Sequence, residues 1–126
     1  MNLDFASVWE MIADIVPNND ALICGDEVIS WKDYDLKASK IASALSSAGL
    51  KENSKAGLYL NNSNEYLIGQ NAIFKIGGVP INVNYRYVAE ELIYLLDNSD
   101  SEAVFYHACY SERIKEISGS LPNVKA

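Results

Sequence analysis

The sequence holds few of the residues that build metal centres, disulfide frameworks or nucleic-acid surfaces. Among 126 residues there are two cysteines and one histidine. Cys24 and Cys109 show neither Cys-x-x-Cys nor Cys/His spacing, so we expect two buried free thiols and no zinc site or disulfide framework. Ten basic residues against seventeen acidic ones give a net charge of -7. That charge repels phosphate backbones, which argues against nucleic acid as a partner.

Long apolar runs and phosphate-binding glycine patterns are also missing. No run approaches the length of a transmembrane helix, and Asp4, Glu10 and Asp14 interrupt the apolar pattern that would otherwise suggest a signal peptide. We therefore expect no membrane insertion and a location in a reducing cytoplasm. None of the seven glycines lies in a GxGxxG or GxxxxGK pattern, so direct evidence for a phosphate cradle is absent.

Apolar spacing and turn residues predict an α/β fold. The first part of the chain reads as an amphipathic helix over 5–16 and a tight hairpin between 21–24 and 28–30. Beyond it, strands alternate with helices, so we expect two successive βαβ crossovers with parallel strands and right-handed connections. The predicted architecture is a three-layer, βαβ-type parallel sheet preceded by a helix and a short β-hairpin. Its strands are expected at 56–60, 79–83 and 103–106, with helices between them and a last amphipathic segment at 110–117. No linker or repeat divides the chain, so we place no domain boundary within residues 1–126.

Capping residues mark where several of the helices begin and end. Ser30 is the expected N-cap of a long helix, and Asn62 that of the next one, which runs to about residue 76. Gly49 is expected to end the long helix in a Schellman motif. The adjacent pair Gly77-Gly78 ends the second helix, with Gly77 in the left-handed conformation and Gly78 allowing a sharp turn into the strand.

The best site candidate by position is a polar group of residues after the predicted strand at 79–83. Parallel α/β sheets usually bind ligands at the carboxyl ends of their strands, and this is such an end. Asn and Arg at these positions also commonly tie loops to the backbone, which is the stronger interpretation here. The residues are Asn82, Asn84, Tyr85 and Arg86.

Other titratable residues give no catalytic pattern. His107 has no Ser, Cys or carboxylate at triad spacing, so we expect a hydrogen-bonded structural histidine. Glu90 and Glu91 fall in the first turn of a helix, where the helix dipole favours acids. Asp97 and Asp100 are expected in a loop. Neither carboxylate pair suggests general acid-base catalysis.

Two segments resemble core motifs of one enzyme family. Residues 29–35, Ile-Ser-Trp-Lys-Asp-Tyr-Asp, resemble the first core motif, Leu-Thr-Tyr-x-Glu-Leu, of the AMP-forming acyl-CoA synthetases. Residues 74–84 resemble the second, Leu-Lys-Ala-Gly-x-x-x-x-Pro-Leu-Asn. This superfamily also contains luciferases and the adenylation domains of peptide synthetases. Residues 84–88 are more similar to ligases for fatty acids and steroid-derived acids, although Val88 stands where the family often has a capping Thr.

The resemblance implies that residues 1–126 are a single N-terminal fragment of an acyl-CoA synthetase domain. For the complete enzyme it implies a two-step ligase reaction. A carboxylate attacks the α-phosphate of ATP to give an acyl-adenylate and pyrophosphate. The thiol of CoA then takes the acyl group. Mg²⁺ would stabilise the negative charge of the phosphates. In the family, the Ser/Thr/Gly-rich loop, the acidic motif and the catalytic Lys all follow the part that this chain covers. We therefore carry over no catalytic, cofactor-binding or metal-binding residue, and expect the chain alone to be inactive and to bind no cofactor. Lys75 could meet CoA phosphates in a whole enzyme, but a surface lysine complementing the helix dipole is favoured.

Several alternatives remain open. The expected partner is the remainder of the synthetase, but the chain could instead be a stand-alone interaction module, for example a homodimer, that keeps the fold without chemistry. It could also be a fragment of a peptide-synthetase adenylation domain. A small-ligand module of the flavodoxin type is disfavoured because the phosphate loop is missing.

Overall fold

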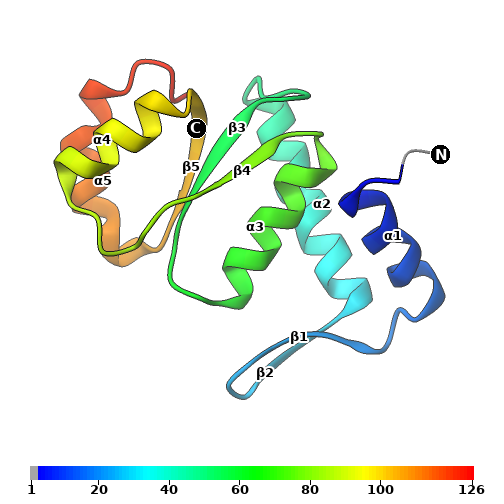
Figure 1. The fold of residues 1–126 in the computed structure, drawn as a ribbon. Helices are drawn as coiled ribbons and strands as arrows, with labels where there is room; N and C mark the ends of the chain where they lie inside the picture. Colours follow the sequence, from blue (N-terminus) through cyan, green and yellow to red (C-terminus); the bar gives the residue numbers. More distant parts are fainter. Residues whose placement is uncertain (1–2) are drawn as a thin grey trace.

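A three-stranded parallel sheet with helices on both faces forms the centre of the protein (Figure 1). The computed structural model describes residues 3–126. Strand β3 (Lys55–Tyr59) lies between β4 (Val79–Asn82) and β5 (Ser101–Tyr106), and both neighbours run parallel to it. The predicted α/β class and the pairing of the first two strands are thereby confirmed.

The helices cover the two faces in pairs (Figure 1). Helices α2 (Trp31–Ser47) and α3 (Asn64–Lys75) pack on one face, and α4 (Ala89–Asn98) and α5 (Ser111–Ile117) on the other. The crossover through α3 leads from β3 to one edge, and the crossover through α4 returns past β3 to the other edge. Two crossovers of the same hand in opposite directions must place their helices on opposite faces. Short 3-10 helices, η1 (Ala108–Tyr110) and η2 (Ser118–Ser120), flank α5.

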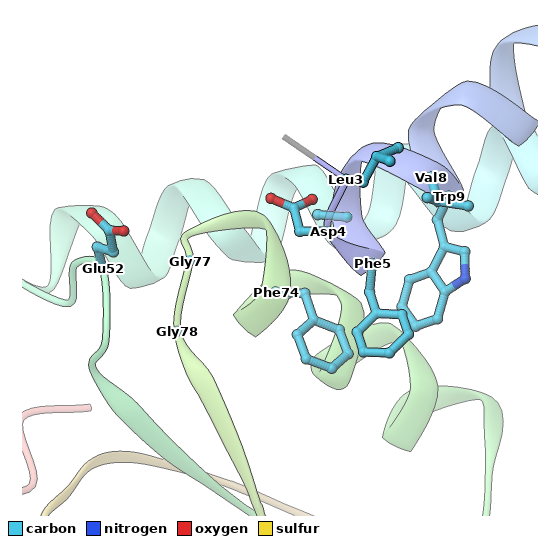
Figure 2. Close-up of a pocket in the computed structure, with 10 residues that line it drawn as sticks. Leu3, Asp4, Phe5, Val8, Trp9, Glu52, Phe74, Gly77 and Gly78 are labelled. Carbon is cyan, nitrogen blue, oxygen red and sulfur yellow. The ribbon is translucent and has the colours of Figure 1, made fainter. Parts of the chain in front are cut away.

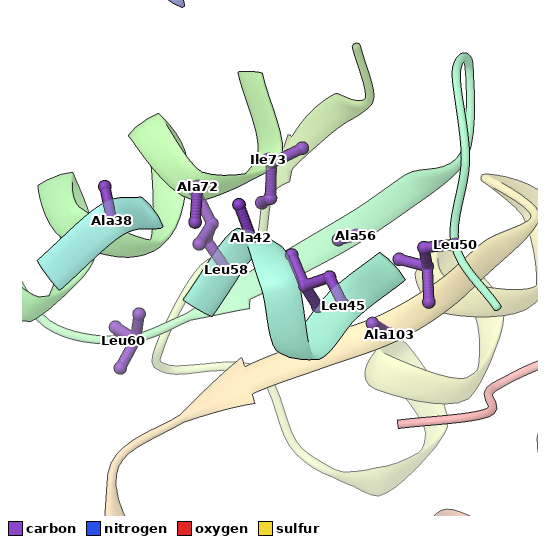
Figure 3. Close-up of a cluster of buried hydrophobic side chains, with 10 residues drawn as sticks. All are labelled: Ala38, Ala42, Leu45, Leu50, Ala56, Leu58, Leu60, Ala72, Ile73 and Ala103. Atoms are coloured by element: carbon purple, nitrogen blue, oxygen red, sulfur yellow. The ribbon is translucent and has the colours of Figure 1, made fainter. Parts of the chain in front are cut away.

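Small side chains let the helices pack closely on the sheet. Figure 3 shows Ala38, Ala42 and Leu45 of α2 over the central strand, beside Ala72 and Ile73 of α3. On the opposite face, a Cβ added at Gly57 of β3 would lie 2.8 Å from Leu96 Cδ2 of α4. A larger residue at that position would therefore force the Leu96 side chain to move.

The N-terminal elements pack on α2 and α3 and take no part in the sheet (Figure 1). They are α1 (Phe5–Ile15) and an antiparallel hairpin of β1 (Asp20–Cys24) and β2 (Glu27–Ser30). Helix α1 buries its small residues Ala6 and Ala13, whereas Phe5 is 64% exposed and Ile15 is 70% exposed. The predicted amphipathic helix is present, but much of its apolar stripe faces outward.

Helix starts agree with the sequence in part. Ser30 Oγ accepts a hydrogen bond from the Asp33 amide at 3.2 Å, which confirms it as the N-cap of α2. The N-cap of α3 is Ser63, whose Oγ accepts from the Tyr66 amide at 3.2 Å, so the prediction of Asn62 was wrong by one residue. Helix α4 begins after Val88, which supplies no side-chain cap, as its lack of a hydroxyl predicts.

Two helices end in Schellman motifs, at the glycines predicted to end them. At the end of α3, Gly77 has φ of 74°, its amide donates to the Phe74 carbonyl, and the Gly78 amide donates to the Ile73 carbonyl, both at 2.9 Å. Gly49 ends α2 in the same way, with φ of 101°. A Cβ at Gly78 would lie 2.8 Å from the Ser54 carbonyl oxygen, so only glycine fits there.

The two edges of the sheet differ in their ability to pair. The Val79 and Val83 amides donate to carbonyls of the β3 segment, so the odd-numbered residues of β4 face β3. Pro80 therefore faces the outer edge, where it offers no N–H. At the other edge, the Lys125 amide donates to the Glu102 carbonyl at 2.7 Å, and the Val104 amide donates to the Ala126 carbonyl at 3.0 Å. The last residues of the chain therefore already pair with β5.

Candidate functional site

The polar residues predicted as a site lie in the connection between β4 and α4, which we call the carboxyl-edge loop, residues 82–88. Asn82 accepts a hydrogen bond from the Tyr66 hydroxyl through Oδ1. Asn84 Oδ1 accepts from the Arg86 amide at 2.9 Å, and the Arg86 guanidinium lies 5.6 Å from the centre of the Tyr85 ring. Asn82 and Asn84 thus each accept a hydrogen bond from a nearby residue of the protein. This agrees with the interpretation that these side chains stabilise the loop.

A network that the sequence did not reveal anchors this loop to the sheet. The Tyr59 hydroxyl donates to the Tyr87 carbonyl at 2.9 Å, and Arg113 Nη1 donates to both the Tyr59 hydroxyl and the Tyr87 carbonyl. Tyr110 stacks on Tyr59 at 4.6 Å between ring centroids and donates to Asn61 Oδ1 at 2.7 Å. The hydrogen bond with Tyr59 raises the pKa of Arg113, so this guanidinium remains charged.

The glycine turn borders a groove of about 680 Å³ (Figure 2). Phe5, Trp9 and Phe74 lie together on one side of it, and Glu52 lies across the glycine turn. Asp4 also lines the groove, and the hydrogen bond from the Ser7 amide lowers its pKa, which keeps this carboxylate charged. The turn sits at the carbonyl end of α3, where the helix dipole is negative. These charges do not fit a triphosphate, so the glycines here have a structural role.

Lys75 is a buried cation that joins three helices. Its ammonium lies 2.7 Å from both Glu10 of α1 and Asp35 of α2, and its side chain is 8% exposed. Burial lowers the pKa of Lys75, but the hydrogen bonds and charges of Asp35 and Glu10 outweigh it and raise the pKa overall. The expectation of a surface lysine was wrong. With both carboxylates already bound, this cation is also poorly placed for CoA phosphates.

The remaining candidates stay apart from one another. His107 is half-buried at the end of β5, and its side chain makes no hydrogen bond within the described part of the chain, contrary to the prediction. Glu90 and Glu91 lie in the first turn of α4, as predicted. Asp97 belongs to the last turn of α4 and not to a loop, whereas Asp100 follows in a left-handed turn with φ of 56°.

Both cysteines are free but exposed, so the prediction of buried thiols was wrong. Cys24 is the last residue of β1, and Cys109 lies in η1. Over residues 3–126, no group of three or more His, Cys, Asp or Glu side chains is arranged to hold a metal ion. Within the same range, no helix is both long and apolar enough to cross a bilayer.

Sequence reasoning missed the residues of the anchoring network. Tyr59 reads as part of a buried apolar strand, and Arg113 lies 54 positions further along the chain. The only available signal was a Tyr in a run otherwise made of Ala, Gly and Leu, because a buried phenol needs a hydrogen-bond partner.

Comparison with known proteins places these features in one family. The sequence model of the AMP-binding enzyme family matches residues 9–126. A medium/long-chain-fatty-acid and 3-oxocholest-4-en-26-oate CoA ligase of Mycobacterium marinum is 41% identical over 123 residues, which is 98% of this chain and 22% of that protein. A 3-oxocholest-4-en-26-oate CoA ligase of Rhodococcus rhodochrous is 35% identical over 125 residues, with 99% of this chain and 22% of the relative covered.

The fold agrees with this assignment. An anthranilate CoA ligase, solved in complex with anthranoyl-AMP, superposes with a TM-score of 0.89 at 21% identity, covering 99% of this chain and 25% of that structure. The chain spans about a fifth of the length of the curated relatives that it matches. On the match of residues 9–126 and the identity to these ligases, the chain belongs to the family of AMP-binding enzymes.

Proposed function

We propose that this chain is the N-terminal scaffold of an AMP-forming acid–thiol ligase. The observation that carries the proposal is the 41% identity to a CoA ligase over 98% of the chain. The two motifs that resemble the family lie at structural junctions: one begins α2, and the other ends α3 and leads into β4. Residues at both junctions determine the direction in which one element follows the next, which is a structural role.

The complete enzyme would join a carboxylic acid to CoA in two steps. A carboxylate oxygen attacks the α-phosphorus of ATP, the bond to pyrophosphate breaks, and an acyl-adenylate forms. The sulfur of CoA then attacks the acyl carbonyl, AMP leaves, and the thiol proton is released. Mg²⁺ and cationic donors outside the present chain would stabilise the developing phosphate charge.

The chain's own contribution would be to hold the carboxyl-edge loop in place. The Arg113 and Tyr59 network fixes the Tyr87 carbonyl, and Tyr66 fixes Asn82. A loop fixed at both ends can form part of a rigid wall beside the acyl and CoA channels. Exposed free thiols at Cys24 and Cys109 are compatible with a reducing cytoplasm.

The substrate is an apolar carboxylic acid of the fatty-acid or steroid side-chain class. The names of the relatives from Mycobacterium marinum and Rhodococcus rhodochrous support this class.

Acid-dependent exchange between ATP and pyrophosphate tests the proposal. The 126-residue chain and the complete polypeptide that contains it are each assayed with medium- and long-chain fatty acids, a steroid side-chain acid and amino acids. Fatty alcohols of equal length, which lack the attacking carboxylate, serve as matched controls. We expect exchange only with the complete polypeptide and only with apolar acids. Exchange by the chain alone would refute the scaffold role, and exchange only with amino acids would identify a peptide-synthetase domain.

A second function, self-association as an interaction module, is favoured by one observation. The large apolar side chains of Phe5 and Ile15 on α1 are mostly exposed, and such surface promotes association. Light scattering over a range of concentrations would detect a dimer, and Phe5→Ser should weaken it. A strict monomer at all concentrations would remove this alternative.

A further inference from the structure

The groove beside the glycine turn carries a cluster of aromatic rings from two helices (Figure 2). The centroid of the Phe5 ring lies 5.9 Å from that of Trp9 and 5.2 Å from that of Phe74, and the last two lie 5.6 Å apart. Phe5 remains 64% exposed despite these contacts. Aromatic rings offer apolar surface, and the π electrons of their faces attract cations. The rings therefore favour a ligand that is apolar, cationic or both.

Two carboxylates line the same groove, and the backbone around each is fixed. Asp4 Oδ1 accepts a hydrogen bond from the Ser7 amide at 2.7 Å, which holds this side chain at the start of α1. Glu52 lies against the glycine turn, where its Cγ is 3.3 Å from the position of a Cβ at Gly77. The neighbouring Asn53 amide donates to the Gly77 carbonyl at 2.9 Å. Within residues 3–126, neither carboxylate forms an ion pair.

The protein itself supplies no positive charge to balance these carboxylates. Among residues 3–126, the lining of the groove includes no basic side chain. Lys75, at the end of α3, is bound at 2.7 Å by both Glu10 and Asp35, so these three groups together carry a charge of -1 and do not repel a cation. The glycine turn lies at the carbonyl end of α3, where the helix dipole adds negative potential. The groove is therefore negative as well as aromatic.

We propose that the groove between α1 and the glycine turn binds an organic cation, namely an ammonium group that carries an apolar chain. The carboxylates of Asp4 and Glu52 attract the ammonium group, and the apolar chain lies on the aromatic rings. Anionic ligands are repelled by the same charges. The glycine turn leads into the start of β4, whereas the carboxyl-edge loop follows its end, so the two sites lie at opposite ends of that strand. The proposal therefore does not depend on the ligase activity.

Three ligands with the same hexyl chain test the proposal: hexyltrimethylammonium, hexanol and hexanoate. The sequence has two tryptophans, so Trp31→Phe leaves Trp9 as the only one, and its fluorescence reports binding in the groove. We expect the cation to bind on the order of tenfold more tightly than the alcohol, from one cation–π contact and two solvent-exposed charge pairs. Hexanoate should bind most weakly. Added salt should reduce the preference for the cation, because it screens exposed charges.

Substitutions in the groove separate the contributions of charge and of the rings. Asp4→Asn and Glu52→Gln should each weaken binding of the cation about threefold and leave hexanol unchanged. Asparagine caps helices as well as aspartate does, so α1 keeps its start. Phe5→Leu keeps an apolar side chain but removes a ring, and should also weaken binding of the cation about threefold. Asp26→Asn, in the turn of the hairpin and outside the groove, removes the same charge and should have no effect.

Calorimetry with the complete polypeptide that contains this chain provides an independent check. The order of the three ligands should be the same there, and loss of binding would overturn the proposal, because another part of the polypeptide would then cover the groove. Equal affinities for the three ligands, or no saturable change in Trp9 fluorescence, would overturn it too. So would equal effects of Asp26→Asn and Asp4→Asn, since net charge alone would explain them. Exchange between ATP and pyrophosphate is measured separately, so failure of this proposal is distinguishable from failure of the ligase assignment.

Discussion

Replacing Gly78 with Ala tests the close approach of the glycine turn to the central strand. The added Cβ would lie 2.8 Å from the Ser54 carbonyl oxygen, 3.0 Å from Ile73 Cγ2 and 3.2 Å from the Ile73 carbonyl oxygen. The Ser54 carbonyl cannot simply move, because it accepts the Val79 amide at 2.8 Å at the start of the pairing between β3 and β4. The substitution must therefore compress backbone atoms and also weaken or break that hydrogen bond.

The expected cost of Gly78→Ala follows from those two terms. Overpacking costs about 1–3 kcal/mol and a lost hydrogen bond about 1 kcal/mol, so unfolding should become easier by about 2–4 kcal/mol. For a domain of this size, 1 kcal/mol lowers Tm by about 4 °C, which gives a decrease of about 8–16 °C.

Two other glycines provide matched controls. Gly77→Ala places an L-residue at φ of 74°, where its Cβ meets only the flexible side chain of Glu52 at 3.3 Å or more and that residue's Cα at 3.6 Å. The left-handed conformation should cost about 1–2 kcal/mol. Gly119→Ala meets nothing within 4 Å and should be neutral or slightly stabilising, through reduced freedom of the unfolded chain.

Thermal unfolding, followed by circular dichroism, measures the melting temperatures of the three variants and of the parent chain. The reasoning requires Gly78→Ala to unfold first, then Gly77→Ala, then Gly119→Ala together with the parent chain. A Gly78→Ala protein that melts within about 2 °C of the parent would refute the argument from the Ser54 carbonyl.

Two further predictions concern a buried phenol and an uncapped helix. Burial raises the pKa of Tyr34 from 10.0 to about 12, so the stability it contributes is complete below pH 10 and is lost between about pH 10 and 12. At pH 11, one unit above the unfolded pKa, the loss should be about 1.4 kcal/mol. In urea unfolding at pH 8 and pH 11, Tyr34→Phe should show a smaller alkaline loss, and equal losses for the two proteins would contradict the prediction. Val88→Thr should stabilise the chain by about 1 kcal/mol, because Val88 has extended φ and ψ angles suited to an N-cap and no capping side chain. Chemical denaturation with Val88→Ala as the control measures this gain, and equal stability of the two variants would count against it.

Local signals allowed much of the fold to be predicted. Ser30 and Gly77 act on backbone groups within a few residues, so the sequence alone specifies where α2 begins and α3 ends. The cap of α3 was misplaced because Asn62 and Ser63 are adjacent and both can cap a helix. The alternation of strands and helices was enough to predict a parallel sheet.

Contacts between residues far apart in the chain could not be predicted from the sequence. Lys75 bonds to residues 65 and 40 positions away, and nothing local distinguishes it from a solvated lysine at a helix end. The exposure of Cys24 depends on the hairpin lying outside the sheet. The polar candidates of the carboxyl-edge loop were correctly located, but their role as loop ties and their anchoring by Arg113 required the three-dimensional arrangement.

The missing N–H at Pro80 has a consequence for synthesis on the ribosome. On the β4 side of the sheet that forms first, this residue offers no donor to a further strand. A proline at this edge therefore weakens pairing between unfinished chains on the β4 side while the rest of the polypeptide is still being made.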